Sequence, residues 1–163
     1  MKRFLAVIVL MIGLSQAKAQ LKTKADCGTM YVEVYKGWIN EVMPSADPER
    51  IKSKIPCFTS FESEGNESKC GGAIYYADKG LTVYIQRDYF LIDEKFKGKL
   101  SMPLMGAKQA ALFTLLGNPK IKDANWEAYQ MSYGTLIIYY NTKKLVNKII
   151  MSTKTTDDIQ LCE

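Results

Sequence analysis

Carboxylates are the only side chains in this sequence that occur in groups suited to acid–base chemistry. They fall into two adjacent pairs and one looser cluster: Asp93 with Glu94, Asp157 with Asp158, and Glu62, Glu64 and Glu67. Two carboxylates that face each other across a cleft can hydrolyse a glycosidic bond. Neighbouring residues on a strand point to opposite faces, so Asp93 and Glu94 are not placed for that chemistry. We expect all these acids to lie on the solvated surface.

Histidine is absent from the sequence. This absence removes Ser-His-Asp and Cys-His catalysis as well as histidine-ligated zinc and haem. The glycines Gly71, Gly72 and Gly117 lack the lysine and the serine or threonine that complete a phosphate-binding loop. The sequence therefore predicts no catalytic residue, no metal site and no cofactor, and a protein that is not an enzyme.

The first 19 residues have the pattern of a cleaved secretory signal peptide. A basic head, Lys2 and Arg3, precedes an apolar run of about 11 residues, and Ala17 and Ala19 suit cleavage before Gln20. Cleavage after Ala17 is the alternative. The apolar run is too short to span a bilayer, which takes about 20 helical residues. No cysteine follows the cleavage site directly, so we expect a soluble protein that is periplasmic or secreted, with no integral membrane segment.

Cleavage also removes most of the net positive charge of the chain. The formal charge falls from +5 to about +2, because Lys2, Arg3 and Lys18 leave with the signal peptide. Arginine, which recognises phosphate groups bidentately, then remains only at Arg50 and Arg87. The lysines are interspersed with acids or lie near predicted turns. We therefore expect a solvated surface and no nucleic-acid partner.

Four cysteines, Cys27, Cys57, Cys70 and Cys162, remain after cleavage. An even number in an exported chain without histidine indicates two disulfides. A zinc site made of all four is the alternative, although the close Cys-x-x-Cys pairs of such sites are missing. We favour Cys57 with Cys70, which closes a short polar loop, and Cys27 with Cys162, which ties the ends of the domain together. In the chain-entropy picture the first closure contributes about 3 kcal/mol and the second nearer 5 kcal/mol.

Residues 20–163 predict a single α+β domain. Apolar residues recur at helical spacing from Tyr31 to Val42, and a second, short helix is delimited by Asp47-Pro48 and Pro56. The stretch GLTVYIQRDYFLIDE, which begins at Gly80, alternates apolar and polar residues on both sides of a turn. This alternation predicts a β-hairpin with one buried face.

The clearest predicted helix lies in GAKQAALFTLLGNP, where Gly117 suits the C-terminal cap and Pro119 prevents continuation. Its wide apolar stripe should pack against the core. Three strands should follow, at residues 126–131, 136–140 and 145–151. We therefore expect helices packed on one face of an antiparallel sheet.

The two predicted hairpins are similar to each other. A shift of 55 residues superposes Leu81 to Ile85 on Leu136 to Tyr140. Each hairpin follows a helix that ends near a proline, and the loop 57–70 is an insertion in the first copy. The pattern predicts two degenerate α-plus-β-hairpin repeats, about residues 29–96 and about residues 104–152.

The second of these repeats resembles a known fold. LLGNP followed by WEAYQMSYGTLIIYYNTKKLVNKI is similar to the repeat of the β-lactamase inhibitor proteins and of the SmpA/OmlA outer-membrane assembly proteins, best over residues 106–151. The resemblance implies helices on an antiparallel sheet, export, and binding to other proteins. The chain lacks the lipid-anchor cysteine of the SmpA/OmlA type and places its cysteines differently from the inhibitor. No functional residue is therefore carried over.

Aromatic residues on the predicted sheet are the candidate binding residues. If the aliphatic residues at alternate positions face the helices, Tyr84 and Tyr139 must face away, at matching positions of the two hairpins. Trp126 or Tyr129 on the neighbouring strand extends this surface. Tyrosine is enriched at interfaces because it combines a large apolar area with a polar group. The alternative is that these residues only stabilise the sheet, as cross-strand aromatic pairs do.

The sequence thus predicts an exported, non-enzymatic protein that binds another protein. Two forms of this prediction are an inhibitor or immunity protein and an assembly component of the cell envelope. The alternative is a small-ligand or lipid carrier, with a cavity between sheet and helix lined by Phe90, Leu112, Phe113 and Met131.

Overall fold

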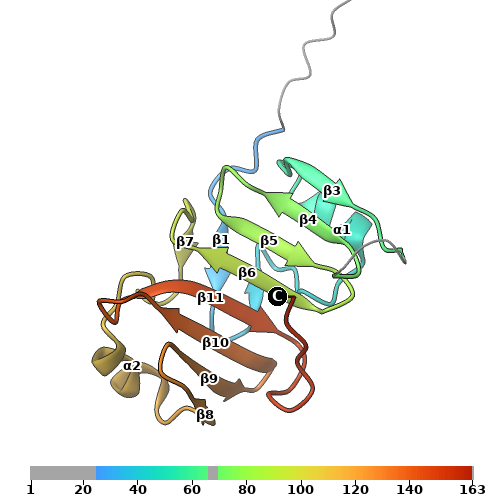
Figure 1. Ribbon diagram of the computed structural model, residues 1–163. Coiled ribbons are helices and arrows are strands. Elements are labelled where there is room, and N and C mark those ends of the chain that lie inside the picture. The colour runs from blue at the N-terminus through green and yellow to red at the C-terminus, as the bar shows by residue number, and fades with distance from the viewer. Residues whose placement is uncertain (1–24, 66–69, 163) are drawn as a thin grey trace, which may run out of the picture.

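The computed structural model describes residues 25–65 and 70–162, which form two helices and two β-sheets (Figure 1). The predicted signal peptide lies outside the described residues. The helices are α1 (Pro48–Lys54) and α2 (Gln109–Leu116). The small sheet contains β1 (Tyr31–Glu33), β2 (Trp38–Ile39) and β7 (Lys99–Leu100). The large sheet contains β3 (Ser60–Glu62), β4 (Ala73–Tyr76), β5 (Leu81–Tyr84), β6 (Tyr89–Asp93), β8 (Ile121–Lys122), β9 (Trp126–Met131), β10 (Gly134–Tyr140) and β11 (Val146–Ser152).

The large sheet consists of two antiparallel meanders that meet at its centre. Its strand order is β3-β4-β5-β6-β11-β10-β9-β8, and every neighbouring pair is antiparallel. The β5–β6 hairpin confirms the prediction made from Gly80 onward, and β9, β10 and β11 confirm the three strands predicted at the end of the chain. The α+β class holds, with sheet as the larger part.

Helix α1 forms where the sequence predicts it. Asp47 is the N-cap, and its carboxylate accepts a hydrogen bond of 2.8 Å from the backbone N–H of Glu49. Pro48 occupies the first turn, where a missing N–H has no cost. Ile51 is the buried residue of the helix and packs in the core. A seven-residue helix thus depends on one cap and one buried side chain.

Helix α2 also forms at the predicted position, but its packing differs from the prediction. Gly117 caps its C-terminus with φ +76°. Leu112 is its buried residue, whereas Phe113 is 62 % exposed. Backbone hydrogen bonds to Lys144 and Val146 fix the start of the helix at the β10–β11 turn. The helix therefore lies at the end of these strands, and most of its apolar stripe does not reach the core.

The helix predicted from Tyr31 to Val42 is wrong, because this segment forms β1, a turn and β2. Val32 and Val34 are buried while Tyr31 and Tyr35 are exposed, which is the alternation of a strand. Further along, Gly37 has φ +69°, Asn40 +47° and Glu41 +64°. These values are incompatible with a right-handed helix.

The core lies between the inner face of the large sheet and the small sheet, α1 and the segment before α2. In Figure 1, β1, β2 and α1 lie behind the large sheet. The inner-face residues Val83, Phe90, Ile92, Leu136, Ile138, Ile149 and Met151 form one cluster with Val32, Ile39, Ile51, Leu104 and Leu112. As predicted, Leu81, Val83 and Ile85 face this core.

Two disulfides are present, but their pairing is not the favoured one. Cys27 is bonded to Cys57 and Cys70 to Cys162, with Cα–Cα distances of 5.4 and 5.5 Å. The N-terminal segment runs past the end of α1, where the backbone N–H of Cys57 lies 3.0 Å from Cys27 Sγ. The C-terminal segment returns over the outer face of the large sheet to reach Cys70. Chain topology, not loop length, thus decides the pairing.

The chemistry of the described residues agrees with an oxidising compartment, where disulfides persist. None of the four cysteines is free for zinc. Among residues 25–65 and 70–162, no group of three or more cysteines and acids is arranged to hold a metal ion. In the same residues, neither helix has the length and apolarity needed to cross a bilayer.

Candidate functional site

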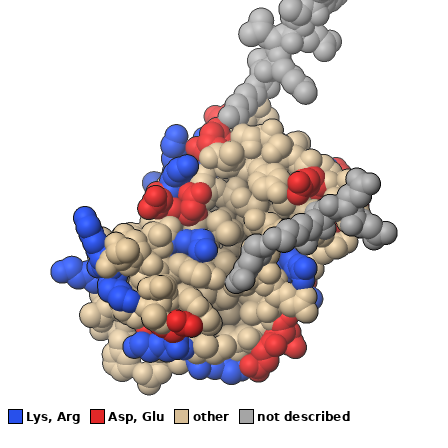
Figure 2. Space-filling view, viewed as in Figure 1, with Lys and Arg blue, Asp and Glu red and all other residues tan. Residues whose placement is uncertain are grey.

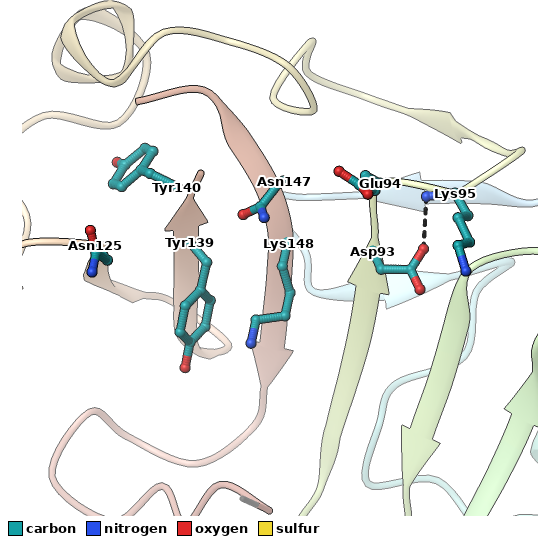
Figure 3. Close-up of a pocket in the computed structure, with 8 residues that line it drawn as sticks. All are labelled: Asp93, Glu94, Lys95, Asn125, Tyr139, Tyr140, Asn147 and Lys148. Carbon is teal, nitrogen blue, oxygen red and sulfur yellow. Dashed lines mark hydrogen bonds between the residues drawn. The ribbon is translucent and has the colours of Figure 1, made fainter. Parts of the chain in front are cut away.

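The outer face of the large sheet carries a row of four side chains from adjacent strands. The register places Asp93 opposite Lys148, Lys148 opposite Tyr139, and Tyr139 opposite Trp126. The Tyr139 and Trp126 ring centroids are 6.4 Å apart, and Lys148 Nζ lies 3.7 Å from the Tyr139 ring centroid. Figure 3 shows Tyr139 and Lys148 side by side on β10 and β11. The row passes from charged to aromatic along the sheet.

A second aromatic pair lies elsewhere on the same face. Tyr84 and Tyr89 face each other across β5 and β6, with ring centroids 4.7 Å apart. The Tyr89 hydroxyl accepts a hydrogen bond of 3.0 Å from the backbone N–H of Cys162. Burial is the main cause that raises the pKa of Tyr89 to about 12. Tyr89 therefore remains neutral and holds the end of the chain.

Tyr84 and Tyr139 both face outward as predicted, but they do not form one surface. Two strands, β6 and β11, lie between them, which makes three strand spacings, and Tyr139 lies four residues further along β10 than the residue at the level of Tyr84. With strands about 4.8 Å apart and a rise of about 3.4 Å per residue, the two tyrosines are separated by about 20 Å. Tyr139 and Trp126 form one local aromatic cluster, and Tyr84 belongs to another.

The C-terminal tail, residues 153–162, crosses the outer face. Thr156 donates hydrogen bonds from its backbone N–H and its hydroxyl to Gln130 Oε1, at 3.3 and 3.2 Å. Asp157 accepts from Lys120 Nζ at 2.7 Å, and Cys162 closes the strap through its disulfide to Cys70. In Figure 1 this segment passes in front of the sheet. The outer face is thus partly covered by the chain itself.

An apolar pocket remains between the tail and the Trp126–Tyr139 pair. We call it the tail pocket. Its volume is about 460 Å³, within the range of sites that bind small molecules or single side chains. Its lining comes from the outer face of β8, β9 and β10 and from the tail: Ile121, Trp126, Ala128, Ile137, Tyr139, Thr156, Ile159 and Leu161. Thr156, Tyr139 and Trp126 supply the polar side-chain atoms of this lining.

A second pocket, of about 310 Å³, lies on the other side of Tyr139 (Figure 3). Its charged lining consists of Asp93, Glu94, Lys95 and Lys148, and a β-bulge between Tyr139 and Tyr140 places Asn147 beside them. Asp93 Oδ1 accepts a hydrogen bond of 2.7 Å from the backbone N–H of Lys95. Tyr139 therefore has an apolar site on one side and a charged site on the other.

Tyr129 does not join this surface, although the sequence proposed it beside Trp126. Trp126 and Tyr129 are three positions apart on one strand, an odd offset, so the two side chains point to opposite faces. Tyr129 faces the core and donates from its hydroxyl to Glu127 Oε2 at 2.8 Å. Tyr140 donates to the same oxygen at 2.5 Å, and Gln109 Nε2 donates to Glu127 Oε1 at 2.9 Å. This buried cluster ties α2 to β9 and β10.

Burial acts to raise the pKa of Glu127, but hydrogen bonds from Tyr140, Gln109 and Tyr129 outweigh it and lower the pKa below its ordinary value. The nearby Lys122 Nζ, 3.4 Å from Oε1, acts in the same direction. Glu127 is therefore a charged, fully hydrogen-bonded group. Its oxygens are occupied by the protein's own donors, which suits a structural role.

Three of the four residues proposed for a carrier cavity lie in the core, and the fourth does not. Phe90 and Leu112 are fully buried and Met131 packs against the same cluster, whereas Phe113 is 62 % exposed. Phe113 instead lines a polar pocket beside α2 with Lys122 and Glu127. An apolar site exists on the opposite face of the sheet, in the tail pocket.

Sequence reasoning missed most of the tail pocket. Ile121, Ile137, Ile159 and Leu161 line it in addition to the expected Trp126 and Tyr139. The alternation of Ile159 and Leu161 in an otherwise polar tail was the available signal.

Comparison of the chain with models of protein families, with curated proteins and with solved structures finds no match.

Proposed function

We propose that this protein is an exported, non-enzymatic binding protein that holds an apolar side chain of another protein in the tail pocket. The pocket itself is the observation that carries this proposal. Ala128 and Ile137 form a buried floor, and Trp126 and Tyr139 form a wall. Aromatic residues around a desolvated pocket are the usual anchor of a protein interface.

The charged site beside Tyr139 supports a protein partner over a purely apolar ligand. Interfaces combine an apolar centre with a polar rim, and Lys148 and Asp93 supply such a rim next to the tail pocket. An inhibitor or immunity protein and an envelope-assembly component both use this kind of surface. The role in the cell follows from the identity of the partner.

The fold that we propose for this protein is two α-plus-meander repeats related by a local two-fold axis, with the helices on one side of the sheet. What supports it is the order of the elements. Helix α1 precedes the meander β3-β4-β5-β6, α2 precedes the meander β8-β9-β10-β11, and β6 pairs with β11 at the centre of the sheet. Such an arrangement is what the resemblance to the β-lactamase inhibitor and SmpA/OmlA repeats implies.

Site-specific crosslinking tests the binding proposal. A photoreactive phenylalanine analogue at Ile121, which is 38 % exposed at the rim of the tail pocket, should form one discrete adduct with the partner in producing cells. The same analogue at Tyr31, which is 45 % exposed on β1, is the matched control.

Adding Tyr139→Ala to the Ile121 probe should remove the adduct, because it deletes one wall of the pocket. Equal adducts from the two probe positions, or an adduct that persists after Tyr139→Ala, would contradict the proposal. Circular dichroism of each variant separates loss of the site from loss of the fold.

A small-molecule carrier is the second candidate, and the volume of the tail pocket favours it. About 460 Å³ accommodates a compact apolar molecule. Native mass spectrometry of the purified protein should then show a bound mass that Trp126→Ala removes and Tyr31→Ala retains. In that case Ile121 crosslinks to no protein.

A further inference from the structure

Helix α2 presents an uncharged face to solvent. Its exposed residues, which we call the α2 face, are Ala110, Ala111, Phe113, Thr114 and Leu115. Phe113 is 62 % exposed and Leu115 is 36 % exposed. A helix on the surface of a globular protein normally turns charged or polar residues to solvent. The composition of α2 is therefore that of a helix whose exposed face also contacts an apolar partner.

Lysines lie at both ends of this helix: Lys108 is its N-cap, and Lys120 and Lys122 follow its end. Residues 95–122 contain six lysines and no aspartate or glutamate. The β10–β11 turn adds Lys143 and Lys144, and the backbone carbonyl of Lys144 accepts a hydrogen bond from Gln109 at the start of α2. In Figure 2 the surface over α2 is tan, and lysine side chains lie beside it.

Part of this positive charge is not neutralised by the fold. Lys120 is paired with Asp157, and Lys122 with Glu127. In the part of the chain that the structure describes, no carboxylate lies within ion-pair distance of Lys108, Lys143 or Lys144. These three residues lie at the start of α2 and on the turn beside it.

We propose that the α2 face docks on a phospholipid surface that carries anionic headgroups. Phe113 and Leu115 would enter the interfacial region, while Lys108 and Lys143 contact the headgroup phosphates. Lys144 Nζ donates to the backbone carbonyl of Ala124 and adds positive charge beside them. Apolar side chains together with lysines are the two elements of reversible binding at such a surface. The site is separate from the tail pocket and does not depend on it.

The charge chemistry favours a lipid surface over an acidic protein. All the positive charge beside α2 comes from lysine, whose flexible stem reaches headgroups without fixed geometry. Arginine, which recognises carboxylates bidentately, is absent from residues 95–122 and from the β10–β11 turn. The exposed apolar area is a single eight-residue helix, which is small for a stable protein interface of roughly 800 Å² per partner.

Vesicle flotation tests the proposal with the chain that lacks residues 1–19. Phosphatidylcholine vesicles that contain phosphatidylglycerol should carry the protein, and pure phosphatidylcholine vesicles should carry little. Phe113→Ser should lower the bound fraction at least about fivefold, because one aromatic side chain supplies much of the inserted area. Phe61→Ser is the matched control, since Phe61 is 40 % exposed on the edge strand β3.

The electrostatic part is tested with Lys108→Gln combined with Lys143→Gln. This variant should bind more weakly than a control with Lys54→Gln and Lys79→Gln, and added salt should remove the difference. Vesicle binding that Phe113→Ser leaves unchanged would overturn the proposal. So would absence of vesicle binding together with a protein crosslink at Phe113, which would identify an acidic protein as the partner. Trp126→Ala should not alter vesicle binding, so this test is independent of the tail pocket.

Discussion

The Tyr140 hydroxyl lies 2.5 Å from Glu127 Oε2 on the inner face of β9 and β10. Glu127 is 4 % exposed, and it also accepts hydrogen bonds from Tyr129 and Gln109. A buried carboxylate with a complete set of donors stabilises the folded chain, and its removal leaves those donors unsatisfied.

Glu127→Gln should therefore lower the free energy of unfolding by about 2 kcal/mol at neutral pH, because the amide is uncharged and its NH2 group would face a donor where a carboxylate oxygen now accepts. Urea unfolding monitored by circular dichroism measures this change. Glu49→Gln, at an exposed position on α1, is the control and should change stability little. Equal stability of the Glu127 and Glu49 variants would contradict the structural role of the cluster.

The same carboxylate should contribute to acid sensitivity. Its pKa is lowered from 4.5 in the folded chain, so the unfolded chain binds the proton more readily. The contribution to stability is complete above the unfolded pKa and is lost as pH falls through the folded pKa. The difference between wild type and Glu127→Gln should consequently be largest near pH 7 and smaller near about pH 3, as measured by urea unfolding at both values.

The tail should depend on its disulfide. In the chain-entropy picture, closing the 92-residue separation between Cys70 and Cys162 contributes about 4.6 kcal/mol. The 30-residue separation between Cys27 and Cys57 contributes about 3.6 kcal/mol. Serine at both Cys70 and Cys162 should thus destabilise the protein more than serine at both Cys27 and Cys57.

Trypsin cleavage measures how the loss of the Cys70–Cys162 disulfide affects the tail itself. Lys154, which is paired with Asp88 at 2.8 Å, is the cleavage site inside the tail. Loss of the Cys70–Cys162 bond should accelerate cleavage there, detected as loss of residues 155–163 by mass spectrometry. The Cys27–Cys57 variant is the control, and equally fast cleavage in both variants would show that the disulfide does not hold the tail.

Gly37 should tolerate no side chain. A Cβ at this position would overlap the ring of Tyr133, which packs on the turn between β1 and β2. Gly28 has a similar positive φ of +59°, but a Cβ there meets nothing within 4 Å. Gly28→Ala therefore measures the backbone cost alone, about 1 kcal/mol.

Gly37→Ala should cost at least about 2 kcal/mol more than Gly28→Ala, because overpacking adds to the backbone cost. Thermal unfolding of the two variants provides the comparison. Similar melting temperatures would mean that Tyr133 moves aside without loss.

The α1 cap gives a prediction of smaller size. Asp47 accepts hydrogen bonds from the backbone N–H groups of Glu49 and Arg50. Asp47→Ala should reduce the free energy of unfolding by about 1 kcal/mol, while Asp47→Asn should retain most of it. Urea unfolding distinguishes the two, and an equal loss in both variants would indicate that charge, not capping, is what matters.

Local signals in the sequence predicted the local structure well. Asp47-Pro48 and Gly117-Asn118-Pro119 mark helix ends, because a helix end depends on the backbone conformations that a few adjacent residues prefer. The alternation in β5, β10 and β11 likewise reports which side of a strand is buried. Between Tyr31 and Val42 the sequence fits both helical spacing and strand alternation. The positive φ angles of Gly37, Asn40 and Glu41 exclude the helix.

What the sequence could not supply is the path of the chain over distant elements. The spacing of the cysteines is compatible with several pairings, and only the return of the tail across the sheet brings Cys162 to Cys70. The tail pocket depends on the same path, since Ile159 and Leu161 meet Trp126 and Tyr139 there. By contrast, the separation of Tyr129 from Trp126 follows from strand parity alone.

The two disulfides also determine how the protein would respond to tension. A pull on Cys27 and Cys162 passes through Cys57, the 57–70 segment and Cys70, because each end is covalently bonded to one side of that segment. Thirteen peptide steps and two bridges extend to about 55 Å at most. Every strand except β3 lies in one of the two closed loops, so a force applied at the two ends is not transmitted along those strands.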